Sequence, residues 1–213
     1  MIRRSVTVVA FLSLAACGGG VSLRVPKKSL DALPVDERLD LLDAENDLFV
    51  AIDKHDDAVE AVRDAREAYR RAASQVAQAV RDLDRSSGSS DPEAVVAREE
   101  LVEAKLHRAW LDRSIDLAEE ALAVADEEVL VARARLERAK AQAVERAKVP
   151  GAASLSMRDF DAQVVRLERR EKSLRDDLAN DRKQANEERG AWLSESRKLS
   201  DMTGGALGSP WVE

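Results

Sequence analysis

Apolar side chains recur every seven residues along the first long stretch of the chain, and the small position of each repeat is alanine. These small positions are Ala44, Ala51, Ala58, Ala65, Ala72 and Ala79. The third residue before each alanine is in most cases a large apolar one: Leu41, Leu48, His55, Val62, Tyr69 and Val76. A seam with this period is typical of helices that coil around each other. The stretch therefore predicts one long helix over residues 35–85.

A second stretch repeats the pattern and predicts a helix over residues 92–148. Its small positions include Ala97, Ala104, Ala118, Ala125, Ala132 and Ala139. The Ser/Gly-rich break before Pro92 is short, which favours an antiparallel hairpin. In that pairing large residues face alanines: Leu48 with Ala132, Ala51 with Val129, Ala58 with Leu122 and Val62 with Ala118. The fold class we expect is all-α, an elongated antiparallel coiled-coil hairpin with an alanine-rich seam.

A third helix is predicted over residues 156–200, because Ser156 and Asp159 fit a capping box and a 3-4 apolar spacing follows. Its apolar positions include Phe160, Val164, Leu167, Leu174, Leu178, Ala185, Trp192 and Leu199. We expect this helix to pack on the base of the hairpin, with Trp192 near Trp110 or Arg113. A two-helix tip of roughly residues 70–105 would project beyond it. The alternative is a third helix that stays apart and binds a partner or a second copy.

Composition supports long helices and argues against a compact enzyme. Charged residues make up 35% of the chain and aromatic residues 3%, and the apolar 45% is largely alanine and valine. Such a composition is typical of coiled coils. The net charge is −7 with both signs interspersed, which argues against a nucleic-acid partner.

The N-terminal residues have the pattern of a secretory targeting signal. Arg3 and Arg4 precede a short apolar run, as in a secretory signal, and the sequence Leu14-Ala15-Ala16-Cys17 ends it. This end resembles the lipobox of bacterial lipoproteins. The resemblance implies removal of residues 1–16 as a signal peptide and acylation of Cys17, which makes the lipid bilayer a partner. In Gram-negative members, a residue such as Gly18 after the cysteine implies an outer-membrane anchor facing the periplasm.

Two alternatives remain for this segment: an ordinary signal peptide that contains a cysteine, or twin-arginine export through Arg3 and Arg4. Cys17 is the only cysteine in the chain, so no internal disulfide competes for it. Residues 17–33 are predicted to be a lipidated flexible linker that reaches about 50 Å when extended. Residues 201–213 are predicted to be a disordered tail. Residues 34–200 then form the three-helix domain.

No motif for catalysis, a cofactor or a metal is present, and an enzyme is not expected. The only histidines, His55 and His107, lie several turns apart in the hairpin register. Three features are candidate partner-binding positions: the hairpin tip near Gly88, Trp192 on the third helix and Trp211 in the tail.

The sequence therefore predicts a non-catalytic, membrane-anchored lipoprotein that acts as a periplasmic helical spacer, scaffold or accessory subunit of the cell envelope. Its partner would be an envelope protein or cell-wall material, and a homo-oligomer is a further alternative. Two other functions remain open: a periplasmic holdase chaperone, and a hairpin component of a transport or secretion assembly.

Overall fold

The structure is a computed structural model, and it describes residues 21–86, 92–150 and 152–208. These residues form five α-helices and one 3-10 turn, and no strand occurs among them. The long helices are α3 (Leu42–Ser86), α4 (Pro92–Arg146) and α5 (Met157–Thr203). The short ones are α1 (Lys27–Asp31), α2 (Val35–Leu39) and the 3-10 turn η1 (Ala152–Ser154).

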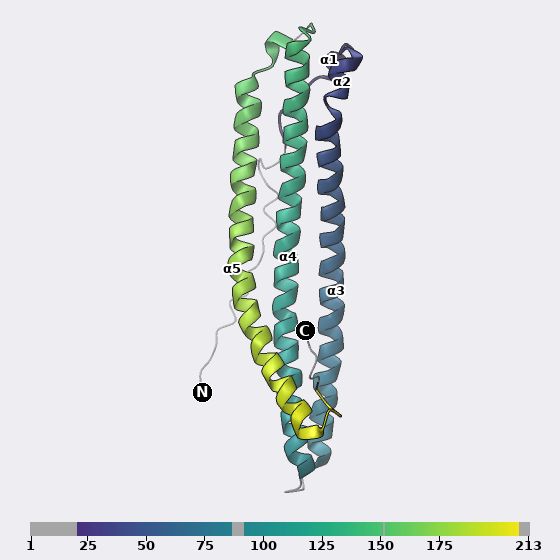
Figure 1. The fold of residues 1–213 in the computed structure, drawn as a ribbon, viewed down its shortest axis with the longest axis vertical. Helices are drawn as coiled ribbons and strands as arrows, with labels where there is room; N and C mark the ends of the chain where they lie inside the picture. Colours follow the sequence, from purple (N-terminus) through teal and green to yellow (C-terminus); the bar gives the residue numbers. More distant parts are fainter. Residues whose placement is uncertain (1–20, 87–91, 151, 209–213) are drawn as a thin grey trace.

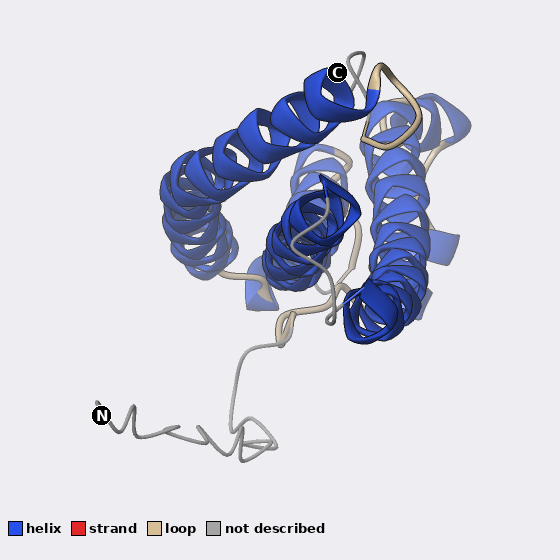
Figure 2. Ribbon diagram, turned by 90° about the horizontal axis from the view of Figure 1, so that it is seen from below, coloured by secondary structure: helices blue, strands red, loops and turns tan. Residues whose placement is uncertain are grey.

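The three long helices form an elongated layer with α4 in the middle (Figure 1). α4 packs against α3 on one side and against α5 on the other. Viewed along the helices, the central helix is flanked on both sides (Figure 2). The expected fold, an antiparallel hairpin with a third helix packed on it, is confirmed.

The alanine seam is buried as predicted. In α3 the buried positions include Ala51, Ala72 and Ala79, and in α4 they include Ala97, Ala104, Ala125 and Ala132. Ala51, Val129 and Ala132 share one core cluster, with Leu48 packed against it. Large residues therefore face alanines in this part of the hairpin, so the two backbones lie close and gain dispersion contacts.

The first predicted helix is interrupted near its start. Pro34 precedes α2 as expected, but the helix stops at Leu39 and resumes at Leu42. The bend lets Leu41 enter a core cluster at the end of α4, together with Leu33 and Val144. Burying these two leucines favours the bend over a continuous helix.

α4 ends in a Schellman motif. The Lys148 N–H donates to the carbonyl of Glu145 at 3.1 Å, and the Val149 N–H donates to that of Val144 at 3.2 Å. Lys148 has a φ of 50°, in the left-handed region that ends many helices. α5 begins after Ser156 as predicted, but the Ser156 side chain makes no capping hydrogen bond.

α5 packs along α4 for longer than the sequence predicted. Val164 and Leu167 share a core cluster with Val131 and Ala134 near the start of α5. Near its other end, Lys198 pairs with Glu99. The predicted two-helix tip of residues 70–105 is therefore too long, because α5 covers α4 well into that range. α5 also bends across α4 toward α3 at this end (Figure 1).

Residues 204–208 turn back on α5, so this part of the predicted disordered tail is ordered. The Thr203 hydroxyl accepts a hydrogen bond from the Leu207 N–H at 3.0 Å. A Cβ at Gly208 would lie 2.3 Å from the carbonyl oxygen of Ser196, so only glycine fits this close approach.

Candidate functional site: the strap face of the layer

Residues 21–25 lie across the layer as an extended strap, although the sequence suggested that they belong to a flexible linker. Their side chains alternate: Val21, Leu23 and Val25 are buried or half-buried, whereas Ser22 and Arg24 are exposed. An extended chain points successive side chains to opposite sides, so one side of the strap packs on the helices. The flexible-linker prediction is therefore wrong for residues 21–33.

The Gln163 side chain on α5 holds the start of the strap. Its Oε1 accepts hydrogen bonds from the Ser22 N–H at 3.1 Å, the Ser22 hydroxyl at 2.9 Å and the Leu23 N–H at 3.2 Å. Gln163 is 3% exposed, so these bonds satisfy a buried carbonyl oxygen. Val21 packs next to Leu130 against the cluster that joins α4 to α5.

The end of the strap is held by α4. The Val25 N–H donates to Glu137 Oε2 at 2.8 Å, and Lys140 pairs with the same carboxylate. Val25 then enters the apolar cluster at the top of the layer, where α1 and α2 follow. Residues 21–33 are thus fixed to the bundle by backbone hydrogen bonds and by buried apolar side chains.

Next to the strap lies a groove of about 560 Å³ on α4, between α3 and α5. Its lining includes Ile52, His55, Leu130, Arg133, Arg170 and Leu174. The groove thus combines apolar side chains with two arginines, one histidine and two acids, Asp126 and Glu127. We call the side of the layer that carries the strap and this groove the strap face.

One buried carboxylate, that of Glu127, belongs to the groove. The residue is 2% exposed, and its Oε2 lies 3.2 Å from Arg170 Nε. Its Oε1 has no hydrogen-bond partner among the described residues. Burial raises the pKa of Glu127, and the charge of Arg170 only partly offsets this.

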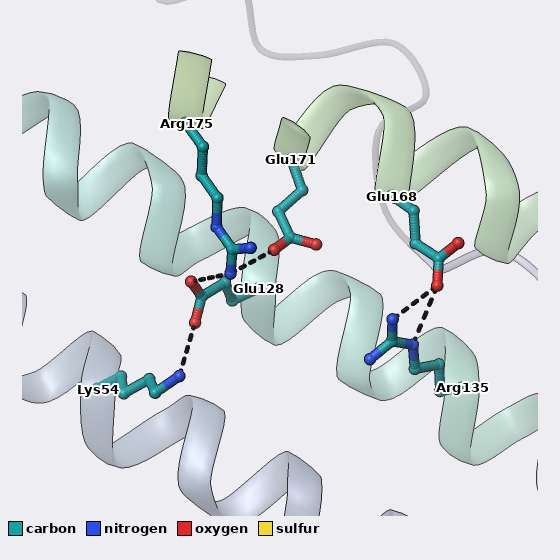
Figure 3. A network of polar contacts seen from close by, with 6 residues as sticks. All are labelled: Lys54, Glu128, Arg135, Glu168, Glu171 and Arg175. Carbon is teal, nitrogen blue, oxygen red and sulfur yellow. Dashed lines mark hydrogen bonds and ion pairs between the residues drawn. The ribbon is translucent and has the colours of Figure 1, made fainter. Parts of the chain in front are cut away.

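The opposite side of the layer, which we call the network face, is lined by ion pairs (Figure 3). Glu128 accepts hydrogen bonds from Lys54 of α3 at 3.4 Å and from Arg175 of α5 at 2.7 Å. Arg175 also pairs with Glu171 at 2.7 Å. Burial favours the neutral acid, but the Arg175 hydrogen bond and the Lys54 charge together lower the pKa of Glu128. The network thus joins all three long helices.

The two faces are opposite because of the helical repeat of α4. Leu130 and Arg133 line the strap-face groove, whereas Glu128 and Arg135 line the network face. Residues two apart on a helix point about 200° away from each other. The strap and the ion-pair network therefore lie on different sides of α4.

Trp192 lies where the sequence placed it, beside Trp110, with ring centroids 4.8 Å apart. It also stacks on His107 at 4.3 Å and donates from Nε1 to Glu103 at 2.6 Å. The side chain is buried, so it is engaged within the chain and is not a surface for a partner. Burial lowers the pKa of His107, while Glu103 opposes this shift.

Three of the other predicted site residues, Cys17, Gly88 and Trp211, lie outside the described residues. His55 and His107 belong to separate sites, since His55 faces Asp126 at 3.3 Å and His107 stacks on Trp192. Among the described residues, no cluster of three or more metal-ligating side chains occurs. None of the described helices is both long and apolar enough to cross a membrane.

Sequence reasoning missed the strap and its two acceptors, Gln163 and Glu137. The alternation from Val21 to Val25 was a readable signal of an extended, half-buried segment. No local pattern marks Gln163 or Glu137 as acceptors, because their donors are more than a hundred residues away in the chain.

Comparisons with models of known protein families, with curated proteins and with solved structures found no match. The proposed function therefore depends on the residues of this chain alone.

Proposed function

We propose that the protein is a non-catalytic lipoprotein, anchored by acylated Cys17 in the outer membrane and facing the periplasm. It acts there as a rigid helical scaffold or accessory subunit of an envelope assembly. The observation that supports this is the position of Val21, which is fixed to α4 and α5 only four residues after Cys17. An acyl group on Cys17 would thus attach the whole helical layer directly to a membrane.

The rigidity of the layer favours a scaffold. α3, α4 and α5 are joined by the alanine seam, the apolar clusters and the Glu128 network. The hairpin of a transport assembly would need a long free tip, and α5 leaves only a short one. The scaffold also offers exposed apolar side chains away from the strap face, among them Val50 and Val165, where a partner could bind.

The first test is the chemistry of Cys17. Mass spectrometry of the mature protein from a Gram-negative host should show a chain that starts at residue 17 and carries acyl groups. Cys17→Ser should leave the chain unacylated and move it from the detergent phase to the aqueous phase on detergent partition. An unmodified Cys17 in the mature wild type would contradict the proposal.

The scaffold role is tested by cross-linking in intact cells. A photo-reactive residue at Val50, an exposed apolar position that lines the network face, should form adducts with a defined envelope protein or with cell-wall material. The same residue at Glu168, an ion-paired position on the network face, is the matched control and should form fewer adducts. The absence of any envelope adduct from both positions would contradict a scaffold role.

A further inference from the structure

We infer that the helical layer lies along the membrane surface, with its strap face toward a bilayer that contains anionic phospholipid. This inference rests on the proposed acylation of Cys17, and it adds the orientation of the molecule. The long axis of the layer would be parallel to the bilayer, in contrast to an upright rod on a flexible linker.

The first argument is the position along the long axis of the layer at which the strap begins. Val21 packs against the same cluster as Leu130, and about 24 Å of α4 separate Leu130 from Arg146 at the near end of the layer. Toward the other end, α4 continues from Leu130 to Pro92 for about 57 Å. The anchored segment therefore leaves the side of the layer and not its end.

The second argument is the length of chain between the anchor and the strap. From Cys17 to Val21 the chain reaches at most about 13 Å, even when fully extended. In an upright molecule, the chain between Cys17 and Val21 would have to span about 24 Å, the distance along α4 from the level of Val21 to the near end of the layer. The available chain is too short for that, so the side of the layer must approach the membrane.

The third argument is that the strap does not supply extra length. Three hydrogen bonds to Gln163, one to Glu137 and the burial of Val25 hold residues 22–25 on the helices. Releasing the strap would leave the Gln163 carbonyl and the Glu137 carboxylate without these donors, and would expose apolar side chains to water.

The fourth argument is the chemistry of the strap face. Ile52 lies in the groove, and Phe49 and Val59 occur three residues before and seven residues after it, which places them on the same side of α3. Phe49 is 65% exposed and Val59 46%. The strap adds one exposed cation on this side, Arg24.

Apolar side chains combined with cations suit the interface of an anionic bilayer, where each basic residue near the surface adds attraction. Asp56, Asp126 and Glu127 oppose this on the same face. His55 lies 3.1 Å from Asp56 and 3.3 Å from Asp126, and Arg170 pairs with Glu127 at 3.2 Å. The network face carries Glu128, Glu168 and Glu171 in ion pairs with arginines, so these basic side chains are already paired with acids.

The test is neutron reflectometry of the acylated full-length mature protein on a supported bilayer of phosphatidylethanolamine and phosphatidylglycerol. A side-on layer should be about 10–25 Å thick, because the molecule is one helix thick where the helices lie side by side and two helices thick where α5 crosses the hairpin. An upright molecule would give a layer of about 80 Å, the length of α4, and this result would overturn the inference.

Two variants connect the orientation to the strap. Gln163→Ala removes the acceptor of three strap bonds, so the tether lengthens and the protein layer should become at least about 10 Å thicker or more distant from the bilayer. Gln184→Ala, at an exposed position of the same helix, is the matched control and should leave the profile unchanged. Equal profiles for both variants and the wild type would overturn the role of the strap.

The orientation and the acylation can fail separately. If mass spectrometry shows an unmodified Cys17, the proposed function fails, and the same chain is then coupled through Cys17 to a maleimide phospholipid in the bilayer. Coupling is site-specific, because Cys17 is the only cysteine. A thin layer in this sample would still support the side-on geometry, and a layer of about 80 Å would overturn it.

Discussion

At the residue scale, the end of α4 shows how one backbone conformation limits stability. Lys148 occupies the left-handed position of a Schellman motif, which disfavours residues with a Cβ by about 1 kcal/mol. The contact between Val144 and Val149 that accompanies this motif is buried in the cluster at the top of the layer. The motif is therefore retained although its central residue is not glycine.

Lys148→Gly is expected to stabilise the protein by about 0.5–1 kcal/mol, because glycine adopts this conformation without a steric penalty. Urea unfolding followed by circular dichroism measures the change. Lys148→Ala is the control, since it removes the charge but keeps the Cβ, and it should bring no gain. Equal stabilisation by both substitutions would show that charge, and not backbone conformation, is responsible.

Glu127 is a buried carboxylate whose pKa is raised by burial. A group with a raised folded-state pKa stabilises the protein below its unfolded pKa and loses that contribution as the pH rises through the folded value. Glu127→Gln removes the buried charge, so it should stabilise the protein more at pH 7.5 than at pH 4. Urea unfolding at both pH values measures the difference.

The control for this substitution is Glu145→Gln, at an exposed position of the same helix. It should show a smaller difference between the two pH values. If Glu127→Gln destabilised the protein at pH 7.5, the pairing with Arg170 would outweigh the burial of the charge, contrary to our expectation.

At the element scale, the alanine seam determines how closely α3 and α4 approach. Ala72 is 1% exposed, so a longer side chain there would have to displace the residues packed around it. Dense packing of this kind makes even small increases in volume unfavourable. The seam thus gains from short side chains despite the apolar surface that alanine lacks.

Ala72→Leu is expected to destabilise the protein by about 1–3 kcal/mol, because leucine would force α3 and α4 apart. Thermal and urea unfolding measure the loss. Ala77→Leu, at an exposed position of the same helix, changes helix propensity by the same small amount and should be nearly neutral. A neutral Ala72→Leu would indicate a seam that is looser than the structure implies.

At the scale of the whole molecule, Trp192 fastens the lower half of α5 to the hairpin. It stacks on His107 and Trp110 and donates to Glu103, and residues 204–208 then turn back on the helix. The upper half of α5 is held by other groups, the Val164 and Leu167 cluster and the Arg175 ion pairs. We therefore expect the two ends of the layer to open separately.

Trp192→Ala is expected to lower the local stability of residues 185–208 by about 3 kcal/mol or more, because a large buried ring is lost. Hydrogen exchange should show faster exchange there and little change near the start of α3. Trp192→Phe keeps a stacked ring and loses the indole donor, so its effect should be smaller. Faster exchange over the whole chain would instead indicate one cooperative unit.

The sequence by itself determined the three long helices, the antiparallel pairing of the first two and the approach of Trp192 to Trp110. These features follow from periodic patterns and short breaks, because local spacing decides which side chains share a face of a helix. Pro92 at the start of α4 and Ser156 just before α5 were readable in the same way.

Only the tertiary structure decided the strap, the bend before Leu42 and the full reach of α5 along α4. Each depends on groups far away in the chain: Gln163 and Glu137 accept from the strap, Val144 packs in one cluster with Leu41, and Glu103 accepts from Trp192. A periodic pattern shows which face of a helix is apolar, but it does not specify which remote segment covers that face. For this protein, that difference separates the flexible linker expected for residues 21–33 from a segment that is fixed to α4 and α5.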